Sequence, residues 1–128
     1  MQQSIENCQK ALAKLKEFLD IAKTNNAEYM HAAVIQAFEY NFELFWKIYQ
    51  KMANQEGEKI GSPKQAFSFA FQSDLIKNEE TWLSILNDRN LTTHTYHREL
   101  ADQIYTRIAN QYYNAFYDAL NIIKAKTK

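Results

Sequence analysis

Residues that form tight turns are scarce in this chain. Its 128 residues include only two glycines, Gly57 and Gly61, and one proline, Pro63, and all three lie in one short stretch. A fold of many strands needs such residues at its turns. Their absence elsewhere excludes a many-stranded architecture and favours helices.

Cysteine and long apolar runs are scarce as well. Cys8 is the only cysteine, so no disulfide can form within the chain, and a reducing compartment is the simpler expectation. The lysine-rich N-terminal segment has no uninterrupted apolar core of a signal peptide, and no run approaches the roughly 20 apolar residues of a membrane span. We therefore expect a cytoplasmic protein that does not enter a membrane.

An excess of positive charge is also missing. Lys and Arg together number 15, as do Asp and Glu. A general polyanion binder usually carries a clear basic excess, so nucleic acid is expected only as a local, site-directed ligand. The chain has no glycine-rich phosphate loop, and His31 and His97 have no carboxylate or cysteine at metal-ligand spacing. No metal and no cofactor are predicted.

The residues that are present suit a helical core. Hydrophobic residues make up 46% of the chain and aromatic residues 14%, enough for one domain over residues 1–128. Apolar residues recur at steps of three and four, and Ser62 and Asn78 can cap helices. We expect an all-α, antiparallel up-and-down four-helix bundle with an additional short helix. The predicted helices span about 5–23, 28–54, 63–76, 79–89 and a final helix from Thr93 or Thr95 to near the C-terminus.

One short segment carries most of the polar chemistry. It contains Arg89, Asn90, His94 and Tyr96, which offer a phosphate ligand, a group that moves protons near neutral pH, and a phenol. On one continuous helix Arg89 and His94 would point about 140° apart. The threonines between them prefer caps and turns, so a break between Asn90 and Thr95 is expected. His94 and Tyr96 would then lie at the N-terminal end of the final helix, where a phosphate is favoured.

Simpler interpretations of the same residues stay open at this point. Arg89 could cap carbonyl groups or pair with Asp88, and His94 could be an ordinary loop residue. The many tyrosines of the last third continue the apolar stripe and are better explained as core than as a platform for bases.

The order of several sequence blocks nevertheless resembles a known family. Arg89, Asn90, His94 and Tyr96 match the Arg-x4-His-x-Tyr motif of the HEPN superfamily. The segments 34–40, 42–47 and 61–64 resemble its nucleotidyltransferase substrate-binding subgroup, and together these blocks cover about residues 5–123. The resemblance implies a helical bundle that forms a homodimer and a two-component module, of toxin–antitoxin type, with a cognate minimal nucleotidyltransferase.

The resemblance also implies roles for individual residues. Arg89 and His94 would be the catalytic pair of a metal-independent ribonuclease acting on RNA, supported by Asn90. Tyr96 would accept AMP from the partner, which would silence the site. Two hypotheses compete with this one: a non-catalytic substrate-binding subunit of the nucleotidyltransferase, and a purely structural helical bundle.

Overall fold

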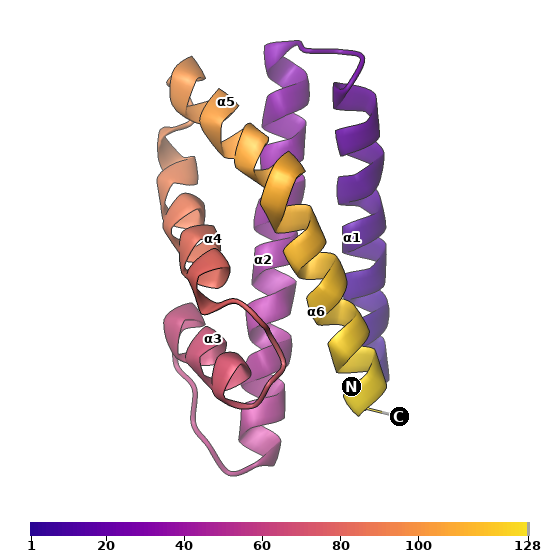
Figure 1. Ribbon diagram of the computed structural model, residues 1–128, viewed down its shortest axis with the longest axis vertical. Coiled ribbons are helices and arrows are strands. Elements are labelled where there is room, and N and C mark those ends of the chain that lie inside the picture. The colour runs from indigo at the N-terminus through magenta and orange to yellow at the C-terminus, as the bar shows by residue number, and fades with distance from the viewer. Residues whose placement is uncertain (128) are drawn as a thin grey trace.

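The computed structural model describes residues 1–127, which are helical over most of their length (Figure 1). The helices are α1 (Gln2–Ala22), α2 (Glu28–Gln55), α3 (Pro63–Gln72), α4 (Glu79–Leu91), the 3₁₀ turn η1 (Thr92–His94), α5 (Arg98–Arg107), the π-helical turn η2 (Ile108–Tyr112) and α6 (Tyr113–Lys126). No strand occurs among residues 1–127. The prediction of an all-α fold is confirmed.

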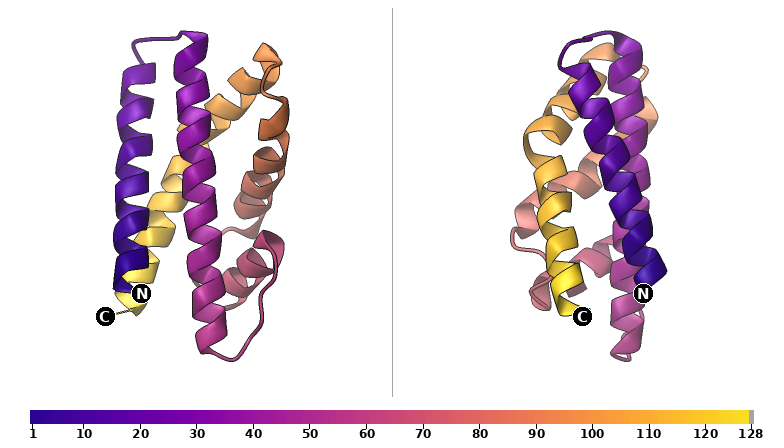
Figure 2. Two further views of the ribbon diagram at one scale, coloured as in Figure 1. Left: turned by 180° about the vertical axis from the view of Figure 1, so that it is seen from behind. Right: turned by 90° about the vertical axis from the view of Figure 1, so that its right-hand side faces the viewer.

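The long helices form two layers. α1 and α2 run side by side in opposite directions, joined by a short turn (Figure 1). α5, η2 and α6 form one continuous rod that crosses them, contacting α2 through α5 and α1 through α6. Seen from the side, the α1–α2 pair and this rod are separate layers (Figure 2). Both termini lie at one end of the molecule, and the segment between α4 and α5 lies at the other (Figure 1).

Two helix starts follow directly from the sequence. The Ser62 hydroxyl accepts a hydrogen bond from the Gln65 backbone N–H at 3.2 Å, with Pro63 as the first residue of α3. The Asn78 side chain accepts one from the Thr81 N–H, also at 3.2 Å, at the start of α4. Each side chain satisfies a backbone donor that has no partner within the helix, so both predicted caps are confirmed.

The end of α3 differs from the prediction. The helix stops at Gln72, not near Ile76, because Asp74 adopts a left-handed conformation with φ of 58°. The N–H of Leu75 then turns back to the carbonyl of Ala70 at 2.8 Å. This reversal buries Leu75 and Ile76 without further helix, so apolar spacing alone extended the predicted helix too far.

Aromatic rings hold α4 against the other helices. The ring of Trp82 lies 5.0 Å from Phe67, 6.0 Å from Phe45 and 5.6 Å from Phe116, measured between centroids. These partners belong to α3, α2 and α6, and all four rings are buried. Contacts of this kind fix the position of α4, whose last turn carries Arg89.

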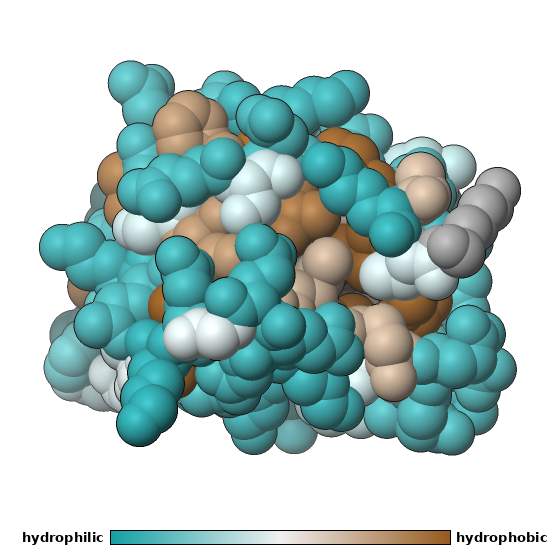
Figure 3. Space-filling view, turned by 90° about the horizontal axis from the view of Figure 1, so that it is seen from below, coloured by the Kyte–Doolittle hydropathy of each residue, from teal (hydrophilic) through white to brown (hydrophobic). Residues whose placement is uncertain are grey.

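The molecular surface is mixed in character. At the end that holds the termini, apolar residues show between polar side chains (Figure 3). A recess of about 270 Å³ lies between the start of α4 and α6, with Ile76, Trp82 and Ala119 in its wall. Across residues 1–127, no helix combines the length and the apolar character that crossing a membrane requires.

Stability is expected to fall at alkaline pH. Burial raises the pKa of the Cys8 thiol from 9.0 to about 12, and burial with a hydrogen bond to Asp88 raises the pKa of the Tyr112 phenol from 10.0 to about 12. The folded chain keeps these protons where the unfolded chain loses them. The stabilisation from these two groups is therefore fully present below about pH 9. Above that value the free energy of unfolding decreases, and it continues to decrease toward pH 12.

Urea unfolding at pH 8 and pH 11 measures this effect. Each group lowers the free energy of unfolding by at most about 1.4 kcal/mol per pH unit within its window. Cys8→Ala should show a smaller decrease between the two pH values than the wild type does. An equal decrease in both proteins would contradict the assignment to Cys8.

Candidate functional site

Arg89 lies in the last turn of α4 and is held from α2. Its Nη1 is 3.3 Å from Oε2 of Glu39 and donates to Oγ1 of Thr92 at 3.1 Å. Oγ1 of Thr92 is in turn 2.9 Å from Oε2 of Glu39. The guanidinium also lies over the ring of Phe42, 5.9 Å from its centroid. Arg89 therefore pairs with Glu39, not with its neighbour Asp88.

Threonine hydroxyls shape the segment after Arg89. Those of Thr92, Thr93 and Thr95 each lie within hydrogen-bonding distance of the carbonyl three residues back, at 2.7, 3.4 and 2.9 Å. Such bonds favour the tight winding of a 3₁₀ turn, and helical structure continues through His94. The α-helix thus ends at Leu91, within the interval predicted for the break, and the non-helical residues of this segment are Thr95–His97.

The final helix begins later than predicted. Its first residue is Arg98, not Thr93 or Thr95, and His97 is the N-cap without a side-chain hydrogen bond. His94 and Tyr96 precede the helix instead of forming its first turn. The prediction that they lie within the N-terminal end of this helix is wrong, because the threonine bonds lengthen the preceding helical run.

His94 and Tyr96 lie against each other on the surface. The Tyr96 hydroxyl is 3.5 Å from Nδ1 of His94, and their ring centroids are 6.0 Å apart. Tyr96 is 74% exposed, and its ring also packs against His97 at 4.4 Å. No hydrogen bond or ion pair joins Arg89 to His94 in the described part of the chain, and Asn90 is exposed. One chain therefore places its arginine and histidine in one segment without direct contact.

A buried carboxylate anchors α4 beside the motif. Asp88 is only 2% exposed, and both of its oxygens accept hydrogen bonds from Arg107, at 2.6 Å from Nε and 2.9 Å from Nη2. The hydroxyl of Tyr112, in the π turn η2, donates to the same carboxylate. Burial of the carboxylate requires such donors. This network cannot be predicted from local sequence patterns, because Arg107 and Tyr112 lie outside α4, on the rod formed by α5, η2 and α6.

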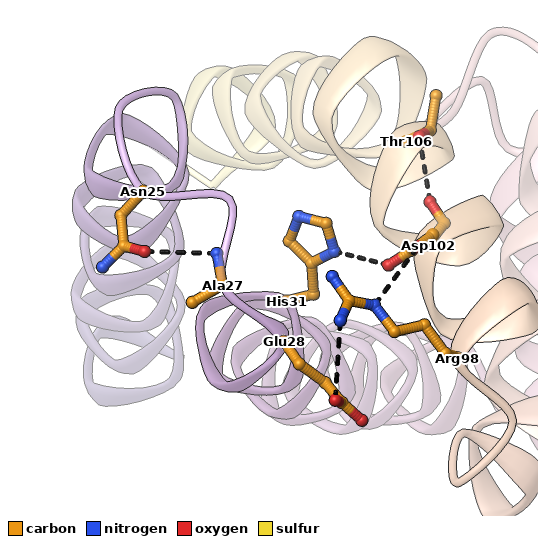
Figure 4. Close-up of polar contacts among 7 residues, drawn as sticks. All are labelled: Asn25, Ala27, Glu28, His31, Arg98, Asp102 and Thr106. Atoms are coloured by element: carbon orange, nitrogen blue, oxygen red, sulfur yellow. Dashed lines mark hydrogen bonds and ion pairs between the residues drawn. The ribbon is translucent and has the colours of Figure 1, made fainter.

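A second polar cluster ties α5 to the start of α2 (Figure 4). Nδ1 of the buried His31 is 2.7 Å from Oδ1 of Asp102, and its ring stacks on Tyr105 with centroids 3.9 Å apart. Arg98 bridges Asp102 and Glu28, at 3.6 Å from each. The sequence pattern does not indicate this pair, since His31 and Asp102 are 71 positions apart. Among residues 1–127 no group of three or more His, Cys, Asp or Glu side chains gathers as a metal site would require.

The arrangement around Arg89 suits an anionic ligand. A guanidinium has five N–H donors, and those on Nη1 serve Glu39 and Thr92. Neither Nε nor Nη2 has a hydrogen-bond partner within residues 1–127, and Nε is buried. Because Nε is buried, Nη2 is the donor through which the group can bind a phosphate. The exposed His94 follows in the next turn of the chain.

Comparison with known proteins places the chain in a family. A family model described as "Nucleotidyltransferase substrate binding protein like" matches residues 3–125. A protein named "Probable ribonuclease HepT" from Haemophilus influenzae is 32% identical over 82 residues. That match covers 60% of this chain and 56% of the relative, so it spans little more than half of the relative's length.

Solved structures share the fold. The Haemophilus influenzae protein HI0074, described as showing the fold of a substrate binding domain of a nucleotidyltransferase, superposes with a TM-score of 0.84 at 21% identity, covering 94% of this chain and 98% of that one. A tri-AMPylated Shewanella oneidensis HEPN toxin in complex with MNT antitoxin has a TM-score of 0.78 at 17% identity, covering 96% and 95%. With the family model spanning nearly all residues, this chain belongs to the nucleotidyltransferase substrate binding protein family.

Proposed function

We propose that this protein is the HEPN subunit of a two-component module with a minimal nucleotidyltransferase, and that it cleaves RNA without a metal. The observation that carries the proposal is the arrangement of the motif: Arg89, whose Nη2 has no hydrogen-bond partner within residues 1–127, is followed one turn later by an exposed His94 whose ring lies 3.5 Å from the Tyr96 hydroxyl. One segment thus contains a phosphate ligand in Arg89, a group that can transfer protons in His94, and a phenol that can be modified in Tyr96.

The chemistry is a transesterification. A neutral His94 removes the proton from the ribose 2′-hydroxyl, whose oxygen attacks the adjacent phosphorus. The 5′-oxygen leaves with a proton, which produces a 2′,3′-cyclic phosphate and a 5′-hydroxyl. Arg89, with Asn90 beside it, binds the phosphate and stabilises the charge that grows in the transition state.

A homodimer would complete this site. Cleavage needs a base for the 2′-hydroxyl and an acid for the 5′-oxygen, and each chain has one His94. Because His94 is exposed, a second copy of the chain could face it across a two-fold axis and supply the other group.

The test is RNA cleavage by the purified protein, without its partner and in the presence of EDTA. We expect cleavage with cyclic phosphate ends, detected by gel electrophoresis and by mass spectrometry of the products. A folded dimer that leaves RNA intact would favour the alternative function, a non-catalytic substrate-binding subunit. The description of the matching family supports that alternative.

AMP on Tyr96 is expected to silence the site. The Tyr96 hydroxyl lies 3.5 Å from Nδ1 of His94, so an AMP group attached there would cover the imidazole and place a negative charge where the RNA phosphate must bind. Incubation with the cognate nucleotidyltransferase and ATP should raise the intact mass by whole AMP units and abolish cleavage.

Matched tyrosine variants make this prediction specific. Tyr96→Phe should prevent the mass increase, or its first unit, and leave cleavage insensitive to the partner. Tyr29 is 67% exposed, similar to Tyr96, and lies in α2, away from the motif in sequence, so Tyr29→Phe should behave as the wild type. Persistence of the full mass increase in Tyr96→Phe would remove Tyr96 from this role.

A further inference from the structure

The pairing of Arg89 with α2 has a consequence for the proposed site. A free arginine side chain on a surface samples many rotamers, and binding a phosphate must restrict them. Here the guanidinium is held through Nη1 by two acceptors, the carboxylate of Glu39 at 3.3 Å and the hydroxyl of Thr92 at 3.1 Å. The ring of Phe42 supports one face of the group.

The contacts leave one edge of the guanidinium unused. Glu39 and Thr92 both engage Nη1, whereas Nε and Nη2 have no partner within residues 1–127. Nε is buried, so an anion can approach the group only at Nη2. Glu39 engages Nη1 and not Nη2, so its carboxylate can stay in place when an anion binds.

We infer that Glu39 is a positioning residue for Arg89: together with Thr92 it fixes the guanidinium so that its Nη2 group faces the RNA phosphate. The inference rests on the proposed ribonuclease function and adds a residue from a helix outside the motif. The shared oxygen Oε2 of Glu39, 2.9 Å from the Thr92 hydroxyl, links the two restraints into one network.

Removal of the Glu39 carboxylate should affect KM and kcat in different ways. Loss of a carboxylate near the site reduces its repulsion of RNA, which lowers KM or leaves it unchanged. Loss of the restraint misplaces Arg89 in the transition state, which lowers kcat. We expect Glu39→Ala to lower kcat at least about 10-fold without raising KM, a pattern that loss of binding affinity would not produce.

Two variants sharpen the measurement. Glu39→Gln keeps an oxygen that accepts from Nη1 and from Thr92, so it should recover most of kcat. Glu43, one turn along α2, is 39% exposed at its side chain against 33% for Glu39, and pairs with Lys47 and Trp46. Glu43→Ala removes the same charge without touching Arg89, so its kcat should match that of the wild type.

A readout independent of cleavage separates this inference from the proposed function. The Nε–H signal of Arg89 in a ¹⁵N–¹H spectrum, assigned by its absence in Arg89→Lys, should shift or broaden in Glu39→Ala and stay in place in Glu43→Ala. If the wild type cleaves no RNA but this signal responds as expected, the proposed function fails and the positioning of Arg89 by Glu39 stands. An unchanged signal in Glu39→Ala, or a kcat that is unchanged or increased in a folded Glu39→Ala dimer, would overturn the inference.

Discussion

Replacing Arg107 with alanine should lower the free energy of unfolding by about 3–5 kcal/mol, because it leaves a buried carboxylate without its counter-charge. Asp88 is 2% exposed, and Arg107 supplies two of its hydrogen bonds. The hydroxyl of Tyr112 would remain as a donor, but one neutral hydroxyl cannot offset the desolvation of the charge. Since the whole free energy of unfolding of a domain is about 5–15 kcal/mol, the loss is a large share of it.

Thermal and urea unfolding measure this effect, and two further variants serve as controls. Arg98→Ala, on the same helix, removes an exposed arginine whose ion pairs are 3.6 Å long, so it should cost no more than about 1 kcal/mol. Adding Asp88→Asn to Arg107→Ala removes the unpaired charge and should recover part of the loss. Similar losses for Arg107→Ala and Arg98→Ala would show that the Asp88 pair is not important for stability.

Replacing His94 with alanine should lower the rate of RNA cleavage by about 10²–10⁴-fold, the usual contribution of one general acid or base. His94 is exposed at the end of η1, and within residues 1–127 its imidazole has one hydrogen-bond partner, the Tyr96 hydroxyl at 3.5 Å. Stability should therefore change by no more than about 0.5 kcal/mol. A loss of activity with an unchanged melting temperature would identify a chemical role and not a structural one.

The neighbouring histidine is the matched control. His97 is exposed, lies three residues further along and also packs against Tyr96, but it stands outside the motif. His97→Ala should keep cleavage within a few-fold of the wild-type rate, measured with the same RNA in EDTA. Equal cleavage by His94→Ala and the wild type would exclude His94 as acid or base and point to a contaminating nuclease.

Local patterns in the sequence were sufficient for the helices and most of their ends. The caps at Ser62 and Asn78 act over three residues, and the spacing of Ile104, Ile108, Tyr112 and Phe116 marks a helix face whatever it packs against. The end of α3 was misjudged because buried Leu75 and Ile76 continue the apolar spacing, while the left-handed Asp74 turns the backbone away.

The motif was partly predictable in the same way. Its residue types indicated phosphate chemistry, and its threonines indicated an irregular segment, but not on which side of His94 the helix would end. A threonine hydroxyl can end a helix or tighten it into a 3₁₀ turn. Here Thr92 bonds back to Arg89 and also reaches Glu39, and that second contact comes from another helix.

The sequence by itself determined the all-α class, the helix faces and the identity of the polar motif, because these depend on residues within a few positions of one another. Only the tertiary structure decided which groups hold Arg89, Asp88 and His31. Their partners lie on other helices: Thr92 and Glu39 are 53 positions apart in the sequence, and His31 and Asp102 are 71 positions apart. Such pairs form only when packing of the apolar faces brings their helices together. The periodicity of residues along one helix does not tell how the neighbouring helix is rotated about its own axis, and so which of its side chains face the first.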